Sequence, residues 1–343
     1  MSFKPSEQLV EKTIGALVSL NEAEVGVELA KAVKKRGVHI GPASQHSLLA
    51  VCAHQDYLEG IRWSWNTLVE EGGHKPSEGL CSQLLRSAAR TGDSTLAASL
   101  IRYMHGTLQV TLTINHFFSL LEAHARVGNV SGLSVLVTYL KAQGLGVVDG
   151  WLDLRLLRVW REQLSTSVSQ VDAAYTTLRE ERSQGRPVEP EVFTTVLDAA
   201  IDLGEPRRAL ALWQGRVELL GEDGAKKGAT NLYASMLSLC RVTADTELMD
   251  QLLKEMKDSE VSPSVQGYVH ALATCLSIEG PGWERAFHFL GAVRSMTRAP
   301  PREMFILMAE RCIAEHDHRG RLLLEEMVNL GYAVPDVLED QLV

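Results

Sequence analysis

The sequence predicts an all-α protein, a solenoid of about nine helix-turn-helix repeats that occupies residues 1–343 as a single domain. Three observations favour this architecture. Apolar residues recur at helical spacing, similar pairs of helical segments return about every 35 residues, and the alternation of apolar and polar residues that is typical of strands is nearly absent.

One unit is clearest in EVFTTVLDAAIDLGEPRRALALW, residues 191–213. Phe193 and Ala200 share the apolar face of a first helix, Gly204 ends that helix, and Pro206 stands where a second helix begins. The segment is therefore interpreted as a helical hairpin with a tight turn.

The same pattern recurs in CSQLLRSAARTG (81–92) and FFSLLEAHARVG (117–128), which begin 36 residues apart, and again in YASMLSLCRVTAD (233–245). Residues 180–190 and 220–230 are polar and lengthen the fifth and sixth units. In chain order, the predicted repeats begin near residues 8, 43, 78, 113, 150, 190, 230, 265 and 302.

Composition excludes several classes of protein. Apolar residues make up 45% of the chain, which is enough for a large core and too much for a disordered chain. The five cysteines form no C-x-x-C pair, which argues against a zinc site or a disulfide framework. No apolar run is long enough to span a membrane, and the N-terminal residues resemble neither a secretory signal nor an organelle transit peptide. The chain is thus expected to be cytosolic or to be a mature form.

Charge is unevenly distributed along the chain. The net charge is −9, so the molecule as a whole does not attract nucleic acid. Residues 1–110 hold 11 Lys and Arg against 11 Asp and Glu, whereas residues 111–343 hold 23 against 32. The acidic C-terminal repeats are therefore a candidate surface for protein partners.

In its repeat motifs the chain resembles the pentatricopeptide repeat family. The segments that carry the resemblance are FTTVLDAAIDLGEPRRALALW (193–213), LLKEMKDSEVSPS (252–264) and LLLEEMVNLGYAVPD (322–336). The resemblance implies a right-handed superhelix whose first helices line a concave face. It further implies binding of single-stranded RNA in mitochondria or plastids, with about one base per repeat.

In that family, base choice rests largely on the residue after the first aromatic of a repeat, together with the last residue of the same repeat. The equivalent residues in this chain are Glu11, Ser82, Phe118, Thr194, Ala234, Val269 and Ile306. Only Ser82 and Thr194 are of the polar type that reads a base, and their partner positions fall near Leu112 and Ala229. Sequence-specific recognition of a long RNA is therefore not expected.

Arginines offer another route to RNA, since they bind phosphates whatever the base sequence. Arg90 and Arg126 occupy equivalent places in adjacent repeats, and Arg86 lies one turn before Arg90. The complete set of RNA-binding candidates is Ser82, Arg86, Arg90, Phe118, Arg126, Arg155, Arg158 and Thr194. The alternative is that these arginines pair with carboxylates of neighbouring repeats.

No motif predicts catalysis, a cofactor or a small-molecule substrate: the chain lacks G-x-G-x-x-G, G-x-x-x-x-G-K-[ST] and G-x-S-x-G. His316 and His318 are interpreted as part of an inter-helix turn, because they lack the i, i+4 spacing of helical zinc sites. No metal is expected.

The sequence thus predicts a non-catalytic RNA-binding component of a mitochondrial or plastid ribonucleoprotein, such as a mitochondrial ribosome or an RNA-processing assembly. Its partners would be organellar RNA or ribonucleoprotein subunits, with protein partners bound through the acidic C-terminal repeats. The alternative is a protein–protein scaffold, or an accessory subunit of an organellar complex, that binds no RNA.

Overall fold

A computed structural model describes residues 5–148, 151–152 and 157–339 of the chain. Helices dominate the described residues, and the strands among them are the two-residue segments β1 (Val147–Val148) and β2 (Trp151–Leu152), which pair antiparallel. The chain forms two compact units, unit 1 (Met1–Gln163) and unit 2 (Leu164–Val343).

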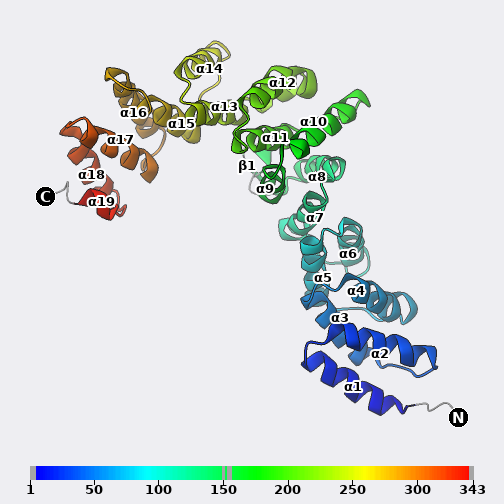
Figure 1. The fold of residues 1–343 in the computed structure, drawn as a ribbon. Coiled ribbons are helices and arrows are strands. Elements are labelled where there is room, and N and C mark those ends of the chain that lie inside the picture. The colour runs from blue at the N-terminus through cyan, green and yellow to red at the C-terminus, as the bar shows by residue number, and fades with distance from the viewer. Residues whose placement is uncertain (1–4, 149–150, 153–156, 340–343) are drawn as a thin grey trace. The chain divides into compact units, whose positions relative to one another are not determined.

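Unit 1 contains four helix pairs in chain order (Figure 1). The first helices are α1 (Glu7–Ser19), α3 (Pro42–His54), α5 (Glu78–Thr91) and α7 (Ile114–Arg126). The second helices are α2 (Ala23–Lys35), α4 (Leu58–Trp65), α6 (Ser94–Gly106) and α8 (Val130–Ala142), and the π-helix η1 (Asn66–Glu71) extends α4. Each first helix packs on the first helix of the next pair, so these helices form a continuous row.

Unit 2 follows the same plan. Its described first helices are α11 (Pro190–Asp202), α13 (Ala229–Thr243), α15 (Val265–Leu276) and α17 (Arg302–Ala314). Its second helices are α10 (Val168–Ser183), α12 (Pro206–Lys227), α14 (Thr246–Asp258), α16 (Ala286–Met296, preceded by η3, Pro281–Arg285) and α18 (Arg319–Asn329). The short α9 (Arg158–Leu164) precedes α10, and α19 (Asp336–Glu339) follows α18.

The prediction of an all-helical repeat architecture with about nine hairpins is confirmed by these helices. The expected start of the fifth repeat near residue 150 lies outside the described residues. That all repeats form one uninterrupted domain stays a prediction.

The turn inside each hairpin follows from local chemistry. After α11, Gly204 has φ +68°, a left-handed conformation that glycine adopts without strain, and α12 begins with Pro206. The N–H of Glu205 donates to the carbonyl of Ala200 at 3.1 Å, and the N–H of Asp245 donates to that of Cys240 at 3.0 Å one repeat later. The periodic sequence therefore repeats a backbone hydrogen bond as well as an apolar face.

Small residues let the two helices of a hairpin approach closely. A Cβ atom at Gly60 of α4 would lie 2.8 Å from Sγ of the buried Cys52 of α3, and 2.4 Å from the Tyr57 ring. A Cβ at Gly320 of α18 would lie 3.0 Å from Cβ of Cys312 of α17, in the equivalent place. Both glycines are thus required by packing, although each lies inside a helix.

Gly60→Ala is expected to lower the free energy of unfolding by about 1–2 kcal/mol, because overpacking costs more than the helix propensity of alanine contributes. Gly15→Ala in α1 is the matched control, since no atom lies within 4 Å of its Cβ position. It is expected to stabilise the protein by about 0.5–1 kcal/mol. Urea denaturation followed by circular dichroism measures both, and equal effects of the two substitutions would contradict the close approach at Gly60.

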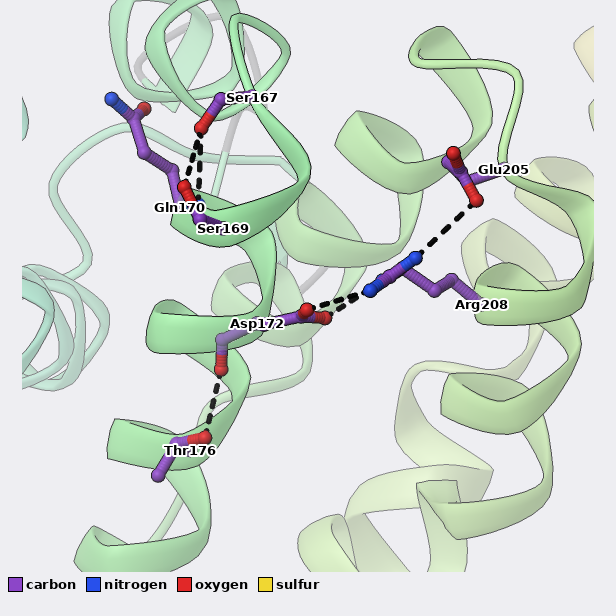
Figure 2. A network of polar contacts seen from close by, with 7 residues as sticks. All are labelled: Ser167, Ser169, Gln170, Asp172, Thr176, Glu205 and Arg208. Atoms are coloured by element: carbon purple, nitrogen blue, oxygen red, sulfur yellow. Dashed lines mark hydrogen bonds and ion pairs between the residues drawn. The ribbon is translucent and has the colours of Figure 1, made fainter.

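Ion pairs link the second helices of unit 2 from one repeat to the next. Arg208 of α12 donates from Nε and from a terminal nitrogen to Asp172 of α10, both at 2.8 Å, and also contacts Glu205 (Figure 2). The same type of link joins neighbouring repeats farther along, in the pairs Arg216–Glu255, Arg285–Asp250, Arg294–Glu326 and Arg319–Glu284. Many arginines of unit 2 are therefore already bound to carboxylates.

Candidate nucleic-acid interface

Three predicted RNA-binding residues lie on one side of α5. Ser82, Arg86 and Arg90 are four residues apart, so that they follow one another along the helix; Ser82 is half-buried and both arginines are exposed. Arg86 forms no ion pair with any described residue. It is the arginine of this helix that a phosphate could bind without displacing a carboxylate.

Arg90 is held by the preceding repeat. Its Nε and one terminal nitrogen donate to the two carboxylate oxygens of Asp56 at 2.8 and 2.6 Å. The same contact holds the pKa of Asp56 below its usual value. The Arg90 side chain keeps 46% of its surface exposed, so that its outer side still faces solvent.

The next first helix repeats this arrangement. Phe118, Glu122 and Arg126 of α7 stand 36 residues after Ser82, Arg86 and Arg90, and α7 packs directly on α5. Arg126 donates to Glu122 in its own helix at 3.1 and 2.7 Å, and its Cβ lies against Gly92 at the end of α5. We call Ser82, Arg86, Arg90, Phe118, Glu122 and Arg126 the unit 1 strip.

The strip is less basic than the arginines alone suggested. Asp56 lies beside Arg90 and Glu122 lies beside Arg126, so each of these arginines has a carboxylate next to it, and Glu122 stands where the neighbouring helix has Arg86. Asp56 and Glu122 were not among the residues predicted from the sequence. The spacing of 34 residues between Asp56 and Arg90, nearly one repeat, is the signal that could have identified the first of them.

Thr194 does not suit the predicted role. Its side chain is fully buried in α11, and its hydroxyl donates to the carbonyl of Pro190 at 2.8 Å. A buried hydroxyl that is already hydrogen-bonded cannot reach a base edge, so Thr194 is corrected to a core residue. Equivalent positions in the repeat period therefore differ in exposure, since Ser82 is half-buried and Thr194 is fully buried.

The remaining candidates do not join the strip. Arg158 of α9 is 71% exposed and pairs with Glu162 in the same helix at 3.3 Å, while Trp160 beside it is buried. Arg155 lies outside the described residues.

Two histidines beside the strip have structural roles. His116 accepts the N–H of Thr113 at 3.0 Å and so completes the capping box of α7. His124 packs against Gly132 of α8, and burial lowers its pKa, which favours the neutral ring. The neutral ring of His124 contributes no charge to a phosphate site.

The two units differ in charge. Unit 1 holds 16 Lys and Arg against 15 Asp and Glu, whereas unit 2 holds 18 against 28, which gives net charges of +1 and −10. The first helices of unit 2 carry Asp198, Asp202 and Glu310 one turn or two after the positions equivalent to Ser82. An electrostatic attraction for RNA therefore favours unit 1.

The described part of the chain holds no group of three or more His, Cys, Asp or Glu side chains placed to bind a metal ion. His318 is 89% exposed, and His316, with φ +56°, lies in the turn between α17 and α18. Within the same described residues, no helix has the length and apolar character needed to cross a bilayer.

Comparisons with known proteins agree with the repeat geometry. A family model described as "Pentatricopeptide repeat-containing protein" matches residues 78–215, and a model described as "Pentatricopeptide repeat domain" matches residues 227–276. The chain belongs to the pentatricopeptide repeat family. No curated protein matches it in a sequence comparison.

Among solved structures, this pentatricopeptide repeat chain is similar to PPR10 from maize, with 16% sequence identity, a TM-score of 0.46, and coverage of 98% of this chain and 50% of that chain. It is also similar to PPR10 in complex with an 18-nt psaJ RNA element, with 18% identity, a TM-score of 0.43, and coverage of 92% and 44%. The chain thus spans about half the length of these proteins.

At most of the positions that read bases in pentatricopeptide repeats, the side chain has another role in this chain. Glu11 accepts the N–H of Gly41 at 3.2 Å and so joins the first two repeats, and Val269 is fully buried. Ser82 keeps part of its surface exposed and forms no hydrogen bond with a described residue, unlike Thr194. The polar pattern expected of a base-reading array is thus present at Ser82 and absent at Glu11, Thr194 and Val269.

Proposed function

We propose that this chain is a non-catalytic RNA-binding component of an organellar ribonucleoprotein, in which unit 1 binds single-stranded RNA and unit 2 binds protein subunits. Membership of the pentatricopeptide repeat family supports an RNA partner and a mitochondrial or plastid location. A mitochondrial ribosome or an RNA-processing assembly is the setting that suits a chain with both kinds of surface.

The unit 1 strip is the observation that carries the proposal. Arg86, Arg90 and Arg126 stand on adjacent first helices with their outer surfaces exposed, and Phe118 beside them is half-buried. Guanidinium groups at this spacing bind phosphates, and an aromatic ring offers a stacking surface for a base. The contacts are mostly to the RNA backbone, so the binding has little sequence preference.

A protein–protein scaffold without RNA is the second candidate. The observation that favours it is the pairing of Arg90 with Asp56 and of Arg126 with Glu122. In a scaffold the Arg90–Asp56 pair serves only to join repeats, both pairs neutralise the face, and the acidic unit 2 is the main docking surface.

Asp56→Asn distinguishes the two functions, because Asp56 competes with phosphate for Arg90. Asparagine tolerates the φ of +57° at this position, and the substitution removes one carboxylate from the strip. If unit 1 binds RNA, we expect affinity for a mixed-sequence single-stranded RNA to rise about threefold, as judged by fluorescence anisotropy of the full chain.

Asp172→Asn is the matched control, since it changes the net charge equally but removes one of the two carboxylate partners of Arg208 in unit 2. Its RNA affinity should equal that of the wild type. Equal effects of the two substitutions would mean that RNA affinity depends on net charge and not on the strip. No saturable RNA binding by any of the three proteins would favour the scaffold, and crosslinking in native cells would then recover no more RNA than an untagged control.

A further inference from the structure

The same junction between consecutive repeats is hollow in both units. In unit 1 a cavity of about 210 Å³ lies where α2, the loop after it, α3 and η1 meet. In unit 2 a cavity of about 450 Å³ lies between α14, the loop 259–264, α15 and α16. Lys34 is the twelfth residue of α2, and Lys257 is the twelfth residue of α14. Gln45 lies seven residues after Val38 of the first loop, and Tyr268 lies seven residues after Val261 of the second. The two cavities are therefore equivalent features of the repeat.

Their walls differ in chemistry. In the unit 1 cavity, Lys34 donates to Thr67 at 3.2 Å and pairs with Glu71, so that polar side chains bind one another across the space. In the unit 2 cavity the equivalent wall is aromatic: the rings of Tyr268 and Phe289 lie 6.1 Å apart, and both residues are half-buried. In the unit 1 wall the Lys34 ammonium is bound by neighbouring side chains, whereas the unit 2 wall leaves apolar surface open to a ligand.

The unit 2 cavity has the composition of a pocket for a side chain. Leu253, Met256 and Pro263 complete its apolar lining. Its volume falls in the range of ligand pockets and exceeds that of a single large side chain. Aromatic residues with partly exposed rings are typical of the few positions that provide most of the binding energy at protein interfaces.

Charge identifies the kind of partner. Lys257 and Glu260 stand at the rim, and neither pairs with a described residue. Since unit 2 as a whole carries a net charge of −10, its field attracts a basic partner and repels an acidic one. Nucleic acid is disfavoured at this cavity for the same reason.

We propose that this cavity, the α14–α16 pocket, holds a large apolar side chain from a basic segment of a partner protein. The inference rests on the proposed function only in assigning unit 2 to a protein partner, and RNA binding by unit 1 is tested separately. Tyr268 and Phe289 form the wall against which the side chain packs, and Glu260 binds a basic residue next to it.

The test uses the full chain and a fluorescein-labelled peptide of 14 residues, all lysine except for two leucines four positions apart. We expect saturable binding in the micromolar range, and no binding by the same peptide with glutamate in place of lysine. Phe289→Ala is expected to weaken binding at least tenfold, and Glu260→Gln several-fold. Leu322→Ala, at a side chain 56% exposed on α18, is the matched control and should leave binding unchanged.

A measurement on the wild-type protein tests the pocket even if the Phe289→Ala variant does not fold. Met256 lines the pocket, so the ¹³C-methyl signal of this methionine, assigned with Met256→Leu, should shift on addition of the lysine peptide. An unmoved signal, absent binding, or equal binding by wild type and Phe289→Ala would overturn the proposal. It would also be overturned if Phe289→Ala abolished self-association in sedimentation, which would make a second copy of the chain the occupant, or if single-stranded RNA displaced the peptide.

Discussion

Truncation of Phe193 to alanine is expected to lower the free energy of unfolding by about 3–5 kcal/mol, a large effect for a single substitution. Phe193 is fully buried in α11, and most of the residues of this helix are buried as well. The reason is its position, because α11 packs against α10, α12 and α13. The cavity left by Phe193→Ala would therefore remove contacts between α11 and several neighbouring helices.

Chemical denaturation followed by circular dichroism measures this effect. Leu322→Ala is the control, because a side chain that is 56% exposed contributes little, and we expect a change below about 0.5 kcal/mol. Hydrogen exchange should show the largest loss of protection in α10–α13, since each repeat of a solenoid depends on its nearest neighbours. A loss of less than about 1 kcal/mol for Phe193→Ala would contradict the burial of α11.

Replacing Arg86, Arg90 and Arg126 together by glutamine is expected to weaken binding of single-stranded RNA by about 100-fold, if each contributes about 1 kcal/mol through a phosphate. The slope of log K against log salt should fall by about two units, since each phosphate contact to a single strand contributes roughly 0.7. Fluorescence anisotropy over a series of salt concentrations gives both quantities.

The control removes three cations from other helices of the same unit: Lys35, Arg36 and Arg102, which lie on α2, at its end and on α6. The net charge is then the same as in the strip variant, and affinity should fall only slightly. If the two triple variants weaken binding equally, the strip is not the RNA site. The segment KAVKKRG (31–37) ends α2 with four cations, which suit the negative end of a helix dipole, and it would then be the place to examine.

The repeat was predictable from sequence because its signals are local. Gly204 adopts the left-handed conformation that only glycine takes easily, and Pro206 fits the first turn of a helix, so the hairpin around them follows from neighbouring residues. The resemblance to the pentatricopeptide repeats, carried by several such units in phase, predicted the family to which the chain belongs. Neither conclusion depends on contacts between distant residues.

The candidate site was predictable only in part. Arg90 and Arg126 were identified as equivalent, and the structure places them on adjacent helices. Thr194 was assigned to the same kind of position and proved to be buried, whereas the equivalent Ser82 of α5 keeps part of its surface exposed. Exposure depends on which helices cover a residue, and a repeat period contains no information about that.

The sequence by itself determined the helical hairpins, their period and the acidic character of the C-terminal repeats, since each depends on residue type and spacing along the chain. Tertiary structure alone decided which cations remain available. Asp56 binds Arg90 although 34 residues separate them, and Arg86 is left without a carboxylate among the described residues. It also decided that one inter-repeat cavity is polar and its equivalent aromatic, because the walls of each come from three helices and a loop. Charge pairing and cavity walls are made by side chains that meet only when the repeats stack, which is why the folded chain, and not the repeat motif, defines the surfaces on which its function depends.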